Sequence, residues 1–177
     1  MVVVEEVLAL KLAGDRVSQK WDERFLEIAR LISTWSKDPS TKVGALAVNP
    51  ERRILAQGYN GFPAGAKDLP SELLNREIKY HKTVHAEANI IFNACNFGVQ
   101  LKLATVYIYG MYPCPECINA LAQVGVARIV FQVGHSENVH KWEELFHDVS
   151  KGILHELGIG FTYYKEGERN GNLNCRV

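Results

Sequence analysis

Two short motifs in this sequence bring together residue types that bind zinc and move protons. His85 precedes Glu87 by two positions, and Cys114 and Cys117 form a C-x-x-C pair further along the chain. Imidazole and thiolate are good zinc ligands, and a site with three protein ligands keeps its fourth tetrahedral position for water. A carboxylate beside zinc-bound water can take the proton of that water and deliver it elsewhere. The motifs therefore predict a catalytic centre in which His85, Cys114 and Cys117 hold zinc and Glu87 carries the proton.

Each motif alone is a weak signal. A single C-x-x-C pair is compatible with a structural zinc or a redox dithiol, and a lone H-x-E has no specific meaning. Together, and in this order, they match the H-x-E and P-C-x-x-C signature of zinc nucleobase deaminases, in which activated water replaces an amino group. An intact Glu87 argues against the non-enzymatic alternative, a nucleotide-sensing or structural zinc module, because such a site has no use for a proton carrier.

Both motifs are expected to open helices, because apolar residues recur at helical spacing over 84–96 and 114–125. A helix start also stabilises the negative charge of the Cys114 and Cys117 thiolates. A helix is also expected over 21–36, with Ser18 as N-cap, Asp38-Pro39 as its end, and an apolar stripe of Phe25, Ile28, Ala29, Ile32 and Trp35. A shorter helix is expected over 71–81, with Ser71 as cap. The remaining expected elements are a hairpin of strands 43–48 and 54–58, strands at 104–110, 128–133 and 159–164, and a long helix over 139–157.

The order of these elements predicts the fold class. Strands that alternate with helices after the hairpin favour parallel strand pairs with helices on the faces of the sheet. We therefore expect an α/β protein, a three-layer α/β/α sandwich around a mixed five-stranded sheet. One domain over 1–177, with a core of about 21–164, is expected from the length. Residues 1–12 fit either a strand or an arm that packs on a neighbour.

Composition limits the partners. Lys and Arg total 20, as do Asp and Glu, so the formal net charge is zero, which lowers the expectation of a nucleic-acid partner. The apolar start contains Glu5, Glu6 and Lys11 and lacks the layout of a secretory signal. No run approaches the ~20 apolar residues of a membrane span. We expect a cytoplasmic protein (in the host cytosol if it is phage-encoded) with no membrane partner.

The remaining cysteines and histidines are expected to have ordinary roles. Cys95 is expected to be a small buried hydrophobic residue, and Cys175 in the tail has no predicted partner. His81 lies four residues before His85, so it could also support that ligand. Surface or packing positions are expected for His81, His135, His140, His147 and His155.

Beyond the two motifs, the stretch from about Trp21 to Tyr164 resembles the cytidine deaminase superfamily and, within it, the dCMP deaminases. The similar segments are DPSTKVGALAV, RILAQGYNGFPAG, HAEANII and YPCPECINALAQVGVARIV. The resemblance implies zinc-dependent deamination of dCMP to dUMP and ammonia, which supplies dUMP for thymidylate synthesis. It also implies that Asn60 hydrogen-bonds the sugar, although GYNG equally suits a turn asparagine in the left-handed conformation. The implied substrate contacts are Asn60, Thr41, Ala86 and Pro113.

The same resemblance implies regulation by nucleotides. Members of the family form hexamers that dCTP activates and dTTP inhibits, with Mg²⁺, and the matching effector residues here are Tyr59, Asn60, Gly61 and Phe62. Some phage members bind a second, structural zinc, but no cysteine precedes Cys95 here, so we expect one zinc per chain. Some members carry a regulatory arginine where this chain has Asn93-Ala94-Cys95-Asn96, which argues against the usual effector response.

Other substrates fit the same motifs. A tRNA or single-strand deaminase would need a basic groove with stacking aromatic residues, which the neutral net charge and the GYNGFPAG loop disfavour. A free base, a nucleoside or dCTP is harder to separate from dCMP. The phosphate of dCMP must meet cations or amide groups, and the candidates for this contact are Lys42, Arg53, Arg76 and Lys82.

Overall fold

The strands form one mixed sheet. The computed structural model describes residues 19–134 and 139–165. Ser18, residues 1–12, His135 and Cys175 lie outside these ranges. The strands are β1 (Gly44–Val48), β2 (Ile54–Tyr59), β3 (Thr105–Gly110), β4 (Arg128–Val133) and β5 (Gly160–Lys165).

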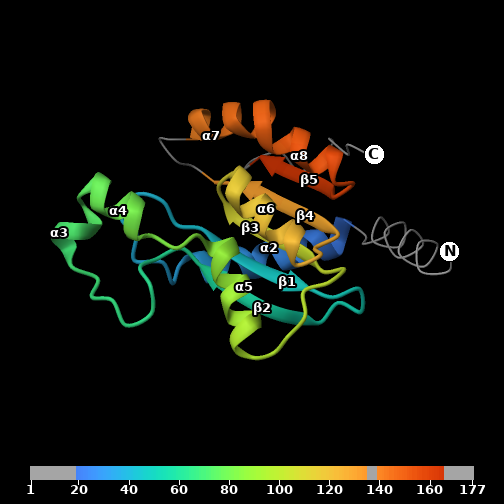
Figure 1. Ribbon diagram of the computed structural model, residues 1–177, viewed down its shortest axis with the longest axis horizontal. Helices are drawn as coiled ribbons and strands as arrows, with labels where there is room; N and C mark the ends of the chain where they lie inside the picture. Colours follow the sequence, from blue (N-terminus) through green and yellow to red (C-terminus); the bar gives the residue numbers. More distant parts are fainter. Residues whose placement is uncertain (1–18, 135–138, 166–177) are drawn as a thin grey trace, which may run out of the picture.

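The sheet has the order β2-β1-β3-β4-β5 (Figure 1). β1 pairs antiparallel with both β2 and β3, and β4 and β5 then continue in parallel to β3. The hairpin and the parallel pairs expected from the sequence are confirmed, as is a mixed sheet of five strands.

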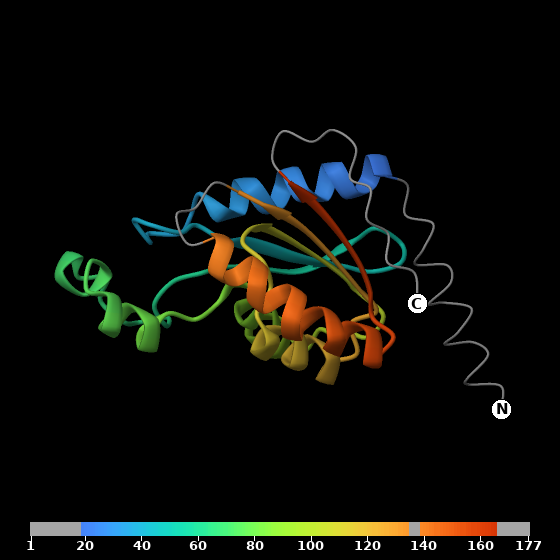
Figure 2. The same ribbon diagram turned by 90° about the horizontal axis from the view of Figure 1, so that it is seen from above.

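Helices cover both faces of this sheet, so the α/β/α architecture is confirmed. Figure 2 shows α2 on one face, with α5, α6 and the C-terminal helical segment on the other. No helix in the described ranges is long and apolar enough to cross a membrane. The helices are α2 (Gln19–Ser33), α3 (Pro70–Leu73), α4 (Arg76–Lys82), α5 (Ala86–Asn96), α6 (Pro115–Gln123), α7 (Val139–Leu145), the π-helical turn η1 (Phe146–Ser150) and α8 (Lys151–Glu156).

The central strand β3 divides the core into two layers because its side chains alternate between the faces. Tyr107 packs with Phe25 of α2 and Leu46 of β1 on one face. Val106 and Ile108 join the larger cluster under α5 and α6 on the other face. Burial of both faces explains why β3 reads as a nearly continuous apolar run.

A buried ion pair fixes α2 to the sheet. Arg128 of β4 donates two hydrogen bonds of 2.9 and 2.8 Å to the carboxylate of Asp22, which is only 2% exposed. The Tyr107 hydroxyl donates to the same carboxylate at 3.0 Å, and Arg128 also donates to Thr162 of β5. Burial raises the pKa of Tyr107, which keeps this hydroxyl a donor. The sequence patterns did not predict this network, which joins one helix to three strands.

Two helix boundaries differ from expectation. α2 ends at Ser33, and the backbone N–H groups of Thr34, Trp35 and Ser36 bond to carbonyls three residues back, which tightens and ends the helix. Trp35 therefore leaves the apolar stripe, is 47% exposed, and meets the Tyr59 ring edge-on at 6.1 Å between centroids. The expected position of Trp35 in the stripe is wrong.

The segment expected to form one helix over 71–81 forms two short helices, α3 and α4. Asn75 interrupts it in an extended conformation, and its side chain accepts a hydrogen bond from the Ile78 N–H, so Asn75 caps α4. Ser71 lies inside α3 and is not a cap.

The long C-terminal helix also departs from regularity, through the wider turn η1 in its middle. This turn places Phe146 and Ser150 in buried positions, where the Ser150 hydroxyl donates to the Pro113 carbonyl at 3.2 Å. A serine at this position can therefore reach the loop that carries the cysteine motif. A hydrophobic period does not reveal such an inserted turn.

Candidate metal centre and its pocket

Three of the four motif residues lie together. The Nδ1 atom of His85 is 3.5 Å from the sulfur of Cys114 and 3.4 Å from that of Cys117. All three ligand atoms lie within 4.8 Å of one another. A tetrahedral zinc bound to nitrogen and sulfur separates these ligands by about 3.5 Å. The spacing and the donor set therefore fit zinc.

The starts of two helices hold this cluster. His85 is the residue before α5, and Cys114 is the residue before α6, with Cys117 in the first turn of α6. Free N–H groups at helix starts favour negative charge nearby. A hydrogen bond with Cys117 and another with His85 lower the pKa of Cys114 to about 5, and the bond with Cys114 raises the pKa of His85 to about 9. The cluster thus already favours a thiolate at Cys114.

Glu87 lies in the first turn of α5, two residues after the metal-ligand candidate His85. Its side chain is only 4% exposed, and it lines the same pocket as His85 and Cys114. Burial raises the pKa of Glu87, although the neighbouring His85 lowers it in part. A carboxyl group with a raised pKa is suited to hold a proton and then release it.

Side chains of α5 fix the helix against the sheet. Asn89 donates to the Tyr59 carbonyl and Asn93 donates to the Gln57 carbonyl, both at 2.7 Å. Gly58 of β2 faces the helix so closely that a Cβ there would lie 2.5 Å from the Ala86 carbonyl oxygen. Since Ala86 separates His85 from Glu87, this contact sets the position of both.

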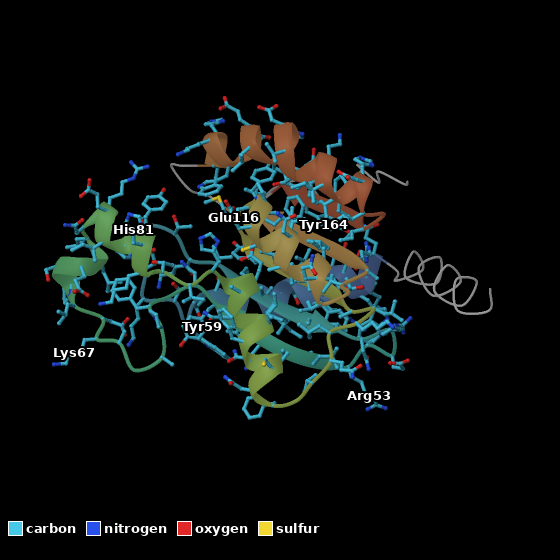
Figure 3. The ribbon with its side chains drawn as sticks, in the orientation of Figure 1. Arg53, Tyr59, Lys67, His81, Glu116 and Tyr164 are labelled. Atoms are coloured by element: carbon cyan, nitrogen blue, oxygen red, sulfur yellow. The ribbon has the colours of Figure 1, made fainter. Side chains whose placement is uncertain are left out.

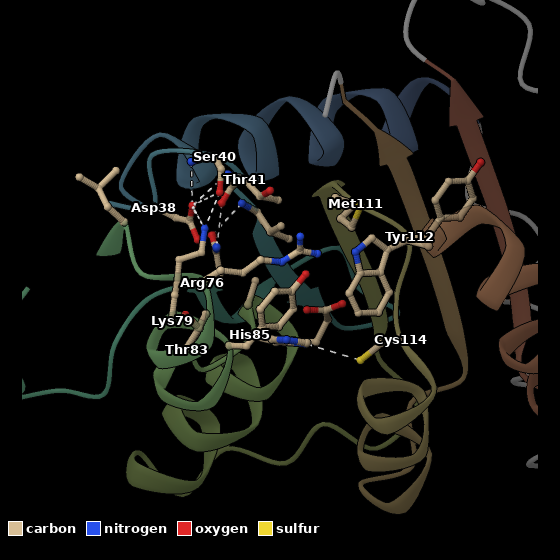
Figure 4. A pocket seen from close by; sticks show the side chains of 17 residues that line it. Asp38, Ser40, Thr41, Arg76, Lys79, Thr83, His85, Met111, Tyr112 and Cys114 are labelled. Carbon is tan, nitrogen blue, oxygen red and sulfur yellow. Dashed lines mark hydrogen bonds and ion pairs between the residues drawn. The ribbon is translucent and has the colours of Figure 1, made fainter. Parts of the chain in front are cut away.

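A pocket of about 360 Å³ opens beside the cluster (Figure 4). This volume lies within the range of small-ligand sites. Thr41, Asn60 and Ala86, which were predicted to contact the substrate, line it. Pro113 is buried but is not among the lining residues, and its carbonyl accepts the hydrogen bond from Ser150.

Asn60 has a supporting role that the sequence did not indicate. Its side chain accepts from the Val43 N–H at 2.8 Å and donates to the Thr41 carbonyl at 2.9 Å. Among the described non-glycine residues, only Arg52 and Leu103 have positive φ, so the left-handed interpretation of Asn60 is wrong. One amide hydrogen of Asn60 is left over from these two bonds for a ligand.

The neighbours of Asn60 in the GYNGF segment, Tyr59, Gly61 and Phe62, are not among the residues that line this pocket. The Tyr59 ring packs against Trp35, Gly61 pairs with Val84 through both backbone groups, and the Phe62 ring lies 4.6 Å from the Lys82 ammonium. Of the four predicted effector residues, Asn60 alone is among the residues that line the pocket, and the effector role of all four stays a prediction.

Several pocket residues escaped sequence reasoning. Trp142 reaches the pocket from α7, far along the chain, and no local pattern connects it to the motifs. Lys79 and Tyr80 come from α4, and Figure 4 shows Lys79 beside Asp38, which the sequence suggested only as the end of a helix. Asp38 accepts hydrogen bonds from Ser40 and from Lys79. The contact between Asp38 and Lys79 joins residues far apart in the chain, so sequence spacing does not indicate it.

Two other expectations have clear outcomes. Cys95 is exposed, so its expected burial is wrong, because α5 turns this position away from the sheet while Ala94 faces the core. His81 is exposed on α4 and is not among the pocket residues, in keeping with the surface position expected for it (Figure 3).

A His-Cys-Cys cluster beside a buried carboxyl group, at the starts of two helices of an α/β/α sandwich, defines the class of zinc-dependent deaminases. Residues 19–133 match the family model of the cytidine and deoxycytidylate deaminase zinc-binding region. The chain belongs to this family and is a deaminase.

Known relatives agree with this assignment. An uncharacterized deaminase in the luxG 3′ region of Aliivibrio fischeri is 35% identical over 144 residues, which cover 81% of this chain and 93% of that protein. The deoxycytidylate deaminase of Mus musculus is 37% identical over 130 residues, 71% of this chain and 70% of that protein. The crystal structure of the cyanophage S-TIM5 dCMP deaminase in complex with dCMP and dUMP has the same fold, with a TM-score of 0.64 and 24% identity over 84% of this chain and 100% of that one.

Proposed function

We propose that this protein deaminates dCMP to dUMP and ammonia, with one zinc ion per chain and the whole chain acting as one deaminase domain. The observation that carries the proposal is the buried Glu87 carboxyl in a pocket that also contains His85 and Cys114. The choice of dCMP is supported by the mouse relative, a deoxycytidylate deaminase. A pocket of about 360 Å³ has the size of a small-ligand site, which suits a free nucleotide.

In this proposal, His85, Cys114 and Cys117 hold the zinc. Zinc bound there would lower the pKa of a water molecule and so supply a nucleophile at neutral pH. The Glu87 carboxylate takes one proton from the attacking water and delivers it to N3 of the cytosine ring as the water oxygen bonds to C4. Glu87 then moves the remaining proton of the new C4 hydroxyl group to the amino group on C4. The carbon–nitrogen bond breaks, ammonia leaves, and the oxygen stays on C4 as the carbonyl of the uracil ring.

Three pocket residues orient the nucleotide, and Pro113 supports the loop that carries the cysteines. Asn60 offers its spare amide hydrogen to the sugar, and its two backbone bonds hold the amide in place. Thr41 and Ala86 line the space around the substrate. Pro113 supports the cysteine loop from below through its carbonyl contact with Ser150.

Regulation forms the outer part of the proposal: a hexamer in the cytoplasm, activated by dCTP and inhibited by dTTP with Mg²⁺ through Tyr59, Asn60, Gly61 and Phe62. One observation weighs against an ordinary response. Asn93, in the stretch 93–96 where some members carry a regulatory arginine, donates its side-chain hydrogen bond to the Gln57 carbonyl.

A substrate panel tests the proposal. Zinc-loaded protein is offered dCMP, CMP, deoxycytidine, dCTP and an adenosine-containing RNA hairpin in parallel, with and without dCTP or dTTP, and ammonia release is measured. We expect dCMP to give the highest kcat/KM. Ammonia release confined to another compound would transfer the assignment to that substrate, and binding without release from any compound would favour a nucleotide-sensing module.

A further inference from the structure

We propose that Arg76 reads the 5′-phosphate of the substrate at the mouth of the pocket and thereby selects nucleoside monophosphates over nucleosides. This inference rests on the proposed function in one respect, because it places the substrate phosphate in the pocket that contains Glu87. Arg76 lines this pocket from the first residue of α4, and Figure 4 shows its side chain extending into the pocket that His85 and Cys114 also line.

The other cations that could meet a phosphate are engaged or lie elsewhere. The Lys42 ammonium donates to the Ser36 carbonyl at 2.6 Å, and Lys42 is absent from this pocket. Lys82 pairs with Glu72, and Arg53 is exposed next to the β1–β2 turn, outside the pocket. Of the four cations suggested by the sequence, only Arg76 remains.

Lys79 is the second cation in the pocket wall, and its charge is already paired. Its ammonium lies 3.0 Å from the Asp38 carboxylate and also contacts the Ser40 hydroxyl. This pair cancels the negative charge of Asp38, which would otherwise repel a phosphate. In the part of the chain that the structure describes, the Arg76 guanidinium has no hydrogen bond or ion pair, so its donors are available.

The same contacts hold Arg76 in place. The Lys79–Asp38 pair fastens α4 to the loop before β1, and Asn75 caps the first turn of α4. Arg76 lies one turn before Tyr80, and its guanidinium carbon is 5.4 Å from the centre of the Tyr80 ring. A planar guanidinium supported by a ring presents a two-pronged donor that matches phosphate oxygens.

The inference is tested with three variants and a pair of substrates that differ only in the phosphate. Arg76→Gln removes the fork and the charge, Arg76→Lys keeps the charge, and Arg53→Gln removes an equal charge outside the pocket as a matched control. We expect Arg76→Gln to lower kcat/KM for dCMP by about 10- to 100-fold, mostly through KM. Deoxycytidine should be turned over as by the unchanged protein, Arg76→Lys should recover part of the loss, and Arg53→Gln should behave normally.

An equal loss with dCMP and deoxycytidine would show that Arg76 only supports the fold, and no loss with dCMP would show that it does not meet the phosphate. A binding measurement separates this inference from the proposed function. Calorimetry with dUMP, which needs no turnover, measures binding alone. Arg76→Gln should bind dUMP at least about 10-fold more weakly than Arg53→Gln does. If dCMP is not deaminated but this difference is found, the phosphate assignment stands and the reaction is wrong; if the difference is absent, Arg76 is not the phosphate reader.

Discussion

The Tyr112 hydroxyl donates a 3.0 Å hydrogen bond to the Glu143 carboxylate, and this bond joins the cysteine loop to the C-terminal helical segment. Tyr112 lies two residues before Cys114, and Glu143 follows Trp142, which lines the pocket. The contact between Ser150 and Pro113 makes a second connection between the same two segments. Residues beyond the matched family region therefore shape the pocket and are attached to the loop that carries two metal-ligand candidates.

Removing this bond should loosen the pocket wall with little effect on the chemical step. Tyr112→Phe should lower the free energy of unfolding by about 1 kcal/mol, the usual net contribution of such a bond. We expect KM for dCMP to rise severalfold while kcat changes little, because Trp142 loses its support and Glu87 does not move. Urea unfolding and steady-state kinetics measure both, with Tyr163→Phe, another hydroxyl deletion in the same aromatic cluster, as the control. A large fall in kcat with an unchanged KM would contradict this view of Tyr112.

Glu87→Gln should stop the reaction without emptying the metal site. The amide has nearly the same size as the carboxyl group but cannot carry protons. We therefore expect kcat to fall by about 10²- to 10⁴-fold. Since burial already disfavours the charged form of Glu87, the neutral amide should not destabilise the fold. Ammonia release is measured together with zinc content, which should remain one per chain. A normal rate of ammonia release would disprove the proton-carrier role.

Metal removal should abolish activity and lower stability together. The three candidate ligands come from the starts of α5 and α6, so zinc would join these two helices. Protein stripped with a chelator should be inactive, should melt at a lower temperature, and should regain both properties when zinc is added back. Cys114→Ser should bind zinc poorly, whereas Cys95→Ser, at an exposed cysteine outside the cluster, should load normally. Full activity in the stripped protein would exclude a catalytic zinc.

The contribution of Asp38 to stability should depend on pH. Burial alone would raise its pKa, but hydrogen bonds from the Ser40 and Thr41 N–H groups and from Lys79 lower it below its ordinary value of 3.8. A carboxyl group with a lowered pKa in the folded state stabilises the fold above its unfolded pKa, and this stabilisation is lost as the pH falls through the folded value.

Asp38→Asn should therefore be less stable than the unchanged protein near about pH 7, and the difference should shrink as the pH falls below about 4. Urea unfolding of both proteins across this range measures the difference. Asp68→Asn, which removes a more exposed carboxylate paired with Lys37, serves as the control and should lower the free energy of unfolding by less than Asp38→Asn does. A difference for Asp38→Asn that grows toward acid pH would show that the assigned hydrogen bonds do not hold the carboxylate.

The parts of the fold that depend on local patterns were predictable. The hairpin, the parallel strands and the helices that begin after His85 and Cys114 each have a period or a boundary signal in their own segment. The boundaries that failed depend on particular side chains. Asn75 caps a helix where Ser71 seemed suited, and the end of α2 at Ser33 removes Trp35 from its stripe.

The site was predictable only where its residues belong to motifs. His85, Glu87 and Cys114 stand out by type and spacing, and the structure places all three in one pocket. Trp142 and Lys79 are brought there by packing between distant segments, which leaves no trace in local spacing. Lys42 and Lys82 carry the right charge, but their pairing with Ser36 and Glu72 becomes visible only in three dimensions.

Asn89 and Asn93 of α5 also protect the edge strand β2 from pairing with a strand of another molecule. β2 is the outermost strand at this side of the sheet, and an outer strand with free carbonyl groups can recruit a strand from another chain and start aggregation. Asn89 and Asn93 occupy the Tyr59 and Gln57 carbonyls, and α5 lies against the strand. The helix that carries Glu87 thus also blocks edge-to-edge assembly. A substitution that detaches α5 from β2 would therefore expose an aggregation-prone edge strand and disrupt the deaminase site together.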